Sequence, residues 1–197
     1  MSACTHFTLT LNVEQSSSHQ NFQEVSHIWP FVSAGLFLTD LDSALNVSVL
    51  TSRNVTLIVN ASGLEHVSYP QLDRLQVFHV PIQDQPHAPL REYFDPVAEQ
   101  INQNQTGATL VHCTAGRSRS PALIMAYLMR LPHLSEGLSL RRAHELVLDR
   151  RPFIRPNAGF WRQLMDYERS LFGTTTVRMA RTSGGILPEE EIRTKVC

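Results

Sequence analysis

The sequence has only three cysteines, a single lysine (Lys195) and no long hydrophobic run. Two of the cysteines, Cys4 and Cys197, lie at the extreme ends, which excludes a disulfide framework and favours a reducing compartment. The first residues lack the features of a signal peptide, and no apolar run approaches membrane-spanning length. We therefore expect a cytoplasmic protein without an integral membrane segment, and the sequence leaves open whether some of it reaches the nucleus or mitochondria.

Charge is scarce overall but unevenly distributed. Charged residues make up 18% of the 197 residues and the net charge is −1. Residues 1–112 carry three arginines against ten acidic residues, a net of −7, whereas residues 113–181 carry twelve arginines against five, a net of +7. A basic half suits an anionic substrate, although most of these arginines are expected only to solvate helix surfaces. Nucleic-acid binding is disfavoured because no basic stretch is interleaved with aromatic residues.

Hydrophobic patterns predict strands early in the chain and helices late. Apolar, β-branched runs predict strands at 55–59, 75–80 and 109–112. Residues 31–38, with Gly35 among them, predict a strand pair or a strand and a turn. Periodic or amphipathic runs predict helices at 40–45, 90–103, 121–130, 140–149 and 158–172. This order predicts a single α/β domain with a mainly parallel central sheet flanked by helices.

The residues around Cys113 carry the chemistry. A predicted strand ends at His112, and a small-residue turn then leads to an Arg-Ser pair that opens a helix. Free N–H groups at a helix N-terminus bind anions and lower the pKa of a cysteine placed there. Arg119 lies six residues after Cys113, and its planar guanidinium can hold two phosphate oxygens. The pattern predicts a nucleophilic thiol in a phosphate-binding loop; the alternative is a structural cysteine beside a helix cap.

The order His-Cys, five residues, Arg-Ser resembles the signature of the cysteine-dependent protein tyrosine phosphatase superfamily, with Gly116 inside the loop. The segment from Pro156 to Leu164 is similar to one found in dual-specificity phosphatases. Residues 173–188 resemble the tail of the atypical subgroup typified by dual-specificity phosphatases 14, 18 and 21. The resemblance implies a protein tyrosine phosphatase-like fold. The polar composition of residues 1–26 predicts a mobile leader. The resemblance implies a catalytic domain (27–172) and a tail partly packed on the domain (173–197).

The resemblance also implies roles for the loop residues. Cys113 is the expected nucleophile, and Arg119 and Ser120 are its expected catalytic partners. The phosphate-binding residues are expected to be Thr114, Ala115, Gly116, Arg117, Ser118 and Arg119. Arg117 replaces the small or apolar residue common at its position, which adds positive charge at the mouth and favours acidic substrates. Ser120 is expected to hydrogen-bond the sulfur, and a helix cap is its alternative role.

Two supporting residues follow from the resemblance as well. His112 is expected to lie beneath the loop and hydrogen-bond its backbone, although a histidine that ends a strand is more often a satisfied core residue. Asn157 is expected to buttress the loop of the general acid, with helix N-capping as the alternative.

A thiol nucleophile needs a proton donor for the leaving oxygen. The family places this acid on a loop after a strand, about thirty residues before the cysteine, and Asp84 fits that position. Asp95 is the competitor, but it falls within a predicted helix, where a solvated carboxylate is the simpler interpretation.

The resulting expectation is a dual-specificity protein phosphatase that acts on phosphotyrosine, phosphoserine and phosphothreonine through a cysteinyl phosphate. The chain lacks the extra segment that deepens the pocket of tyrosine-specific relatives, and no histidine spacing indicates a metal site, so no metal or cofactor is expected. Expected partners are phosphorylated proteins, signalling kinases among them; the oligomeric state stays open. The alternatives are a phosphatase of a non-protein phosphomonoester, disfavoured by the single lysine, and a phosphoprotein-binding module with little turnover.

Overall fold

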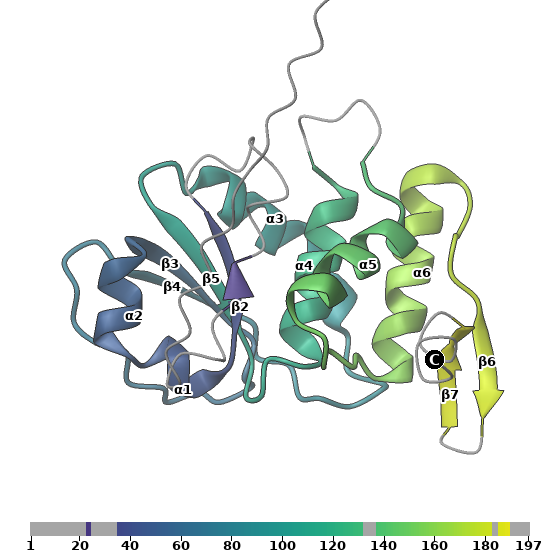
Figure 1. Cartoon of the computed structure of the whole chain (residues 1–197), viewed down its shortest axis with the longest axis horizontal. Helices are drawn as coiled ribbons and strands as arrows, with labels where there is room; N and C mark the ends of the chain where they lie inside the picture. Colours follow the sequence, from purple (N-terminus) through teal and green to yellow (C-terminus); the bar gives the residue numbers. More distant parts are fainter. Residues whose placement is uncertain (1–22, 25–34, 132–136, 183–184, 190–197) are drawn as a thin grey trace, which may run out of the picture.

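Five strands form the central sheet, and four of them run parallel (Figure 1). The computed structural model describes residues 23–24, 35–131, 137–182 and 185–189. The strand order is β1-β2-β5-β3-β4, with β1 antiparallel to β2. The strands are β1 (Gln23–Glu24), β2 (Leu36–Thr39), β3 (Val55–Asn60), β4 (Gln76–His79) and β5 (Ala108–His112). The predicted α/β fold with a mainly parallel sheet is confirmed.

The four parallel strands end level with one another. In the sheet register Thr39 pairs with His112, His112 with Asn60, and Asn60 with His79. Cys113 directly follows His112, so the thiol leaves the sheet from a central strand. In open α/β sheets ligands bind outside the carboxyl ends of the strands, which places a candidate site at this edge.

Helices cover both faces of the sheet. They are α1 (Leu41–Ala44), α2 (Val47–Ser52), the 3-10 turn η2 (Leu90–Tyr93), α3 (Phe94–Gln103), α4 (Arg119–Met129), α5 (Leu140–Arg150) and α6 (Ala158–Phe172). Asp40, Asn46, Ser139 and Asn157 cap α1, α2, α5 and α6 by accepting backbone N–H groups. The helix predicted from residue 90 begins as η2, and Pro96 then falls in the first turn of α3, where its missing N–H costs least.

The core has two layers because successive strand residues point to opposite faces. Leu38, Val59 and Val111 face the large layer under α3 to α6, whereas Ile58 and Leu110 face a smaller layer on the side of α1 and α2. Every residue of β3 and β5 is buried, as expected for parallel strands covered on both faces.

The helix that follows the thiol loop differs from the prediction. The sequence indicates an amphipathic run from Pro121 to Arg130, but every residue of α4 is buried. Helices α3, α5 and α6 and the sheet all pack against it, so no face reaches solvent (Figure 1). The N-terminus of α4 is therefore held within the core of the domain.

The chain after α6 packs back on the domain. Gly173 ends α6 in the left-handed region, with φ 75°, and a hairpin then lies beside α6 (Figure 1). Its strands are β6 (Met179–Thr182) and β7 (Gly185–Pro188). The buried Glu168 accepts backbone N–H groups from Leu140 and Thr176 and the hydroxyl groups of Thr175 and Thr176. This network joins the start of the C-terminal segment to α5 and α6.

Within the stretch expected to be a polar leader, Gln23–Glu24 form β1. The rest of residues 1–26 lies outside the described residues, as do Cys4 and Cys197. Of the helices that the structure describes, none combines the length and apolar character needed to span a bilayer.

Candidate active site

The Cys113 thiol lies between the end of β5 and the N-terminus of α4. Ser120 Oγ donates a hydrogen bond to the sulfur at 3.2 Å, and the backbone N–H groups of Ser118 and Ser120 also donate toward it. Burial raises the pKa of the thiol, but these hydrogen bonds and the charge of Arg119 outweigh it, so the pKa of Cys113 lies below its ordinary value. The arrangement can supply a thiolate nucleophile.

We expect Ser120→Ala to raise the pKa of Cys113 by about one to two units, because a hydrogen bond to an ionised group contributes about 1.5–3 kcal/mol. Alkylation by iodoacetamide against pH measures this value, since only the thiolate reacts. The matched control is Ser52→Ala, because the Ser52 hydroxyl donates to the carbonyl oxygen of Val49 within α2. An unchanged titration midpoint in Ser120→Ala would refute the contribution.

The Arg119 side chain is buried and held by backbone carbonyls. Its Nη1 donates to the carbonyl oxygens of Ser62 and Ile82, and its Nη2 donates to Thr114 Oγ1 at 3.2 Å. Among the described residues, nothing accepts a hydrogen bond from its buried Nε. This open donor can bind an oxygen of a phosphoryl group, with the rest of the guanidinium already fixed in orientation.

Asp84 lies on the loop after β4 and faces the thiol loop. Its Oδ1 accepts hydrogen bonds from Ser118 Oγ at 2.7 Å and Asn157 Nδ2 at 2.8 Å, and its Oδ2 is 4.0 Å from Arg119 Nε. Asn157 Oδ1 also accepts two N–H groups of the first turn of α6. The two interpretations of Asn157 are therefore compatible, since one side chain caps a helix and contacts Asp84.

The loop of Asp84 packs closely on α6. A Cβ atom at Gly159 would overlap the carbonyl oxygen of Pro86, so only glycine permits this approach. The competing carboxylate, Asp95, instead accepts hydrogen bonds from Arg130 at 2.7 Å and Tyr167 Oη at 2.5 Å. Within the described residues, its hydrogen bonds join α3 to α4 and α6 rather than to the thiol loop.

His112 is fully buried beneath the loop. Its Nδ1 lies 3.1 Å from the carbonyl oxygen of Cys113, and its Nε2 lies 2.6 Å from Tyr69 Oη. Burial lowers the pKa of His112 to about 4, so the ring is neutral at pH 7. Because a carbonyl only accepts, Nδ1 carries the proton and Nε2 accepts from the tyrosine hydroxyl. No local sequence signal marks Tyr69, which completes this pair of bonds.

Arg151 is a second residue that no motif marks, and it is fully buried behind the loop. Its Nε donates to Gly116 O at 2.8 Å, its Nη2 donates to Ala115 O at 3.3 Å, and Nη2 lies 3.6 Å from Asp40 Oδ2. Gly116 has φ 63°, and a Cβ there would meet Arg151 Nη2 at 2.6 Å. Arg151 thus fixes the loop by binding two of its carbonyls.

Arg151→Lys is expected to lower the free energy of unfolding by about 1–3 kcal/mol, because lysine cannot make both loop hydrogen bonds with one planar group. We also expect weaker competitive inhibition by inorganic phosphate, since the loop loses its fixed shape. Urea denaturation and inhibition assays measure the two effects, with Arg150→Lys as the neighbouring control. Equal phosphate inhibition in wild type and Arg151→Lys would contradict the positioning role.

The Arg117 side chain turns toward Phe153. Its Nε donates to Phe153 O at 3.2 Å, and its guanidinium lies 5.9 Å from the centre of that ring. The same ring, half-exposed, lies 4.5 Å from the guanidinium of Arg151. The loop residues predicted to bind phosphate are contiguous in the chain, and the exposed Arg117 side chain contacts Phe153.

A parallel sheet that ends in a buried thiol, followed by a loop at a helix N-terminus and a buried arginine, is typical of a cysteine-dependent phosphatase. The family profile described as "Dual specificity phosphatase, catalytic domain" matches residues 36–170. Human dual specificity protein phosphatase 14 is 46% identical over 161 residues, which cover 80% of this chain and 78% of the relative. Human dual specificity protein phosphatase 18 is 40% identical over 167 residues, which cover 82% of this chain and 86% of the relative. Human dual specificity protein phosphatase 21 is 40% identical over 185 residues, which cover 92% of this chain and 94% of the relative.

Solved structures agree with the sequence comparisons. A mouse putative dual specificity phosphatase complexed with zinc tungstate superposes with a TM-score of 0.68 at 31% identity, covering 83% of this chain and 96% of that one. Human DUSP28 superposes with a TM-score of 0.62 at 38% identity, covering 69% and 89%. The chain therefore belongs to the dual-specificity phosphatase family, as an atypical member of the subgroup of phosphatases 14, 18 and 21.

Proposed function

We propose that Cys113 carries the phosphatase reaction by attacking the phosphorus of phosphotyrosine, phosphoserine and phosphothreonine side chains. The observation that supports this most is the hydrogen bond from Ser120 Oγ to the Cys113 sulfur, together with the buried Arg119 guanidinium whose Nε is open. Both lower the pKa of the thiol. The S–P bond forms in line as the bond to the leaving oxygen breaks. The N–H groups of residues 114–119 and the Arg119 guanidinium bind the equatorial oxygens and the charge that develops on them.

Asp84 supplies the proton that the leaving serine, threonine or tyrosine oxygen needs. As a carboxylate it then takes a proton from water, which attacks the phosphorus and breaks the S–P bond. Inorganic phosphate leaves, the Cys113 thiolate is restored, and the Ser120 hydroxyl stabilises that thiolate as it departs. Asn157 and Ser118 hold the Asp84 carboxylate over the loop through its Oδ1.

The function is tested by hydrolysis of p-nitrophenyl phosphate and of phosphotyrosine, phosphoserine and phosphothreonine peptides in EDTA. The proposal predicts metal-independent turnover of all four. Turnover restricted to phosphoinositides or other non-protein phosphomonoesters, or tight phosphopeptide binding without turnover, would overturn it in favour of the two alternatives.

We further propose that the substrates include phosphorylated signalling kinases and that the protein works in the cytoplasm. A thiolate nucleophile requires a reducing compartment, because oxidation to a sulfenic acid or a disulfide removes the nucleophile. Reductant-reversible loss of activity in peroxide supports this dependence, and activity indifferent to peroxide would contradict it.

A further inference from the structure

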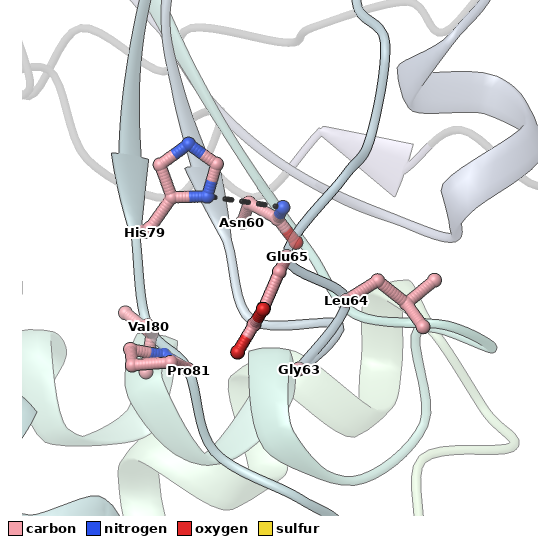
Figure 2. Close-up of a pocket in the computed structure, with 7 residues that line it drawn as sticks. All are labelled: Asn60, Gly63, Leu64, Glu65, His79, Val80 and Pro81. Atoms are coloured by element: carbon pink, nitrogen blue, oxygen red, sulfur yellow. Dashed lines mark hydrogen bonds between the residues drawn. The ribbon is translucent and has the colours of Figure 1, made fainter.

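A small pocket lies at the carboxyl ends of β3 and β4 (Figure 2). Its volume is about 200 Å³, below the range of about 300–1,000 Å³ that holds drug-sized ligands. The space therefore suits one side chain of a partner. The pocket is lined by Asn60, Gly63, Leu64, Glu65, His79, Val80 and Pro81.

The two loops that form this pocket also hold Arg119. Its Nη1 donates to the carbonyls of Ser62 and Ile82, which adjoin the pocket residues Gly63 and Pro81. A ligand in the pocket would therefore contact two residues, Gly63 and Pro81, that each adjoin a hydrogen-bond partner of Arg119 in the chain.

The sheet register places the pocket beside the strand that precedes the thiol. Asn60 and His79 lie level with His112, which precedes Cys113, in neighbouring strands. Adjacent strands are about 4.8 Å apart, so a pocket between β3 and β4 lies about 7 Å from the line of β5. In an extended peptide, side chains two residues apart lie on the same face at about that spacing.

Glu65 supplies the only carboxylate among the residues that line this pocket. Asn60 Oδ1 accepts the N–H of Ser62 at 2.9 Å, so its Nδ2 faces His79 Nδ1 at 3.4 Å. Figure 2 shows the Glu65 side chain extending across the pocket toward Val80 and Pro81.

We infer that the pocket binds an arginine or lysine side chain two residues from the phosphorylated residue of the protein substrate. The aliphatic stem of that side chain packs on Leu64, Val80 and Pro81, and its cation meets the Glu65 carboxylate. Leu64 is 49% exposed, an apolar rim that such a stem covers. The inference rests on the proposed function and specifies its substrate class.

Phosphotyrosine peptides with arginine, norleucine or glutamate at positions −2 and +2 test the pocket through kcat/KM. At one of these positions we expect arginine to exceed norleucine by about two- to fivefold, the range of a solvent-accessible ion pair. Glu65→Gln should bring that ratio close to one, and Glu65→Lys should make glutamate the preferred residue. Glu99→Gln, an exposed acid on α3, should keep the wild-type ratio.

The outcomes separate the two proposals. Wild-type turnover without any preference at either position overturns the pocket while leaving the proposed function intact. An arginine preference that persists in Glu65→Gln also overturns it, because another carboxylate must then bind the cation. If wild type hydrolyses neither the peptides nor p-nitrophenyl phosphate, the proposed function itself fails.

Discussion

Cys113→Ser is expected to lower the turnover of p-nitrophenyl phosphate and phosphopeptides by at least about 10⁴-fold, because the attacking thiolate is replaced by a hydroxyl that stays protonated. The hydrogen bonds and positive charge that lower the pKa of the thiol cannot ionise a serine to a useful extent. The groups proposed to bind phosphate, namely the loop N–H groups and the Arg119 guanidinium, are untouched by the change. Phosphopeptide affinity should therefore persist, which fluorescence polarisation measures alongside steady-state kinetics.

Two controls make this result specific. Cys4→Ser makes the same substitution elsewhere in the chain and should leave turnover near the wild-type rate. Thermal unfolding shows whether Cys113→Ser keeps the fold, since Cys113 is buried against the core. A folded Cys113→Ser protein that turns over substrate normally, or that no longer binds phosphopeptide, contradicts the role assigned to the thiol.

Asp84→Asn is expected to lower kcat/KM for phosphoserine peptides by about 10²–10⁴-fold, the usual contribution of a general acid. The loss of kcat/KM, which reports the first chemical step, should be much smaller for p-nitrophenyl phosphate, because nitrophenolate departs without a proton. Asparagine keeps the size of the side chain and an oxygen for the hydrogen bonds from Ser118 and Asn157. A dependence on the leaving group therefore reports proton donation rather than a displaced loop.

Asp95→Asn is the matched control for this prediction. Asp95 binds Arg130 and Tyr167, so its replacement should affect stability more than catalysis. If the loss that depends on the leaving group follows Asp95→Asn instead of Asp84→Asn, the assignment of the acid is wrong.

The thiol loop could be predicted because its chemistry is contiguous in the chain. A strand, a thiol, a turn and a helix N-terminus follow one another from residue 108 to 120, and local geometry brings them together. Asp84 is chosen from the family resemblance, which places the general acid on a loop after a strand, and the structure puts that strand end at the same edge of the sheet as the thiol. Its role as the acid stays a prediction. The structure then adds the contacts of its carboxylate with Ser118 and Asn157, which belong to two other segments.

Arg151 could not be predicted, because nothing local distinguishes it from its neighbour. Arg150 lies in the same basic run yet pairs with the exposed Asp149 at 3.3 Å, whereas Arg151 is buried against the loop carbonyls. Which of the two turns inward depends on how α5 packs on α4. Tyr69 could not be predicted either, because it lies 43 residues before its partner His112, in a loop without a motif.

The burial of α4 was also beyond the sequence pattern. Its apolar residues are equally compatible with a helix that buries only one face. The remaining face is buried because three helices and the sheet pack around α4. This packing matters for the site because it fixes the helix N-terminus that faces the thiol.

Rapid acid quenching of the enzyme during turnover, followed by peptide mass analysis, tests the central claim most directly. The proposed mechanism predicts one phosphoryl group on the peptide that contains Cys113. The amount of this phosphorylated peptide should rise in Asp84→Asn with a substrate whose leaving group needs no acid, because activation of water is slowed. Steady turnover with the phosphoryl group on another residue, or with no phosphoenzyme under quenching fast enough to trap it, would contradict the mechanism.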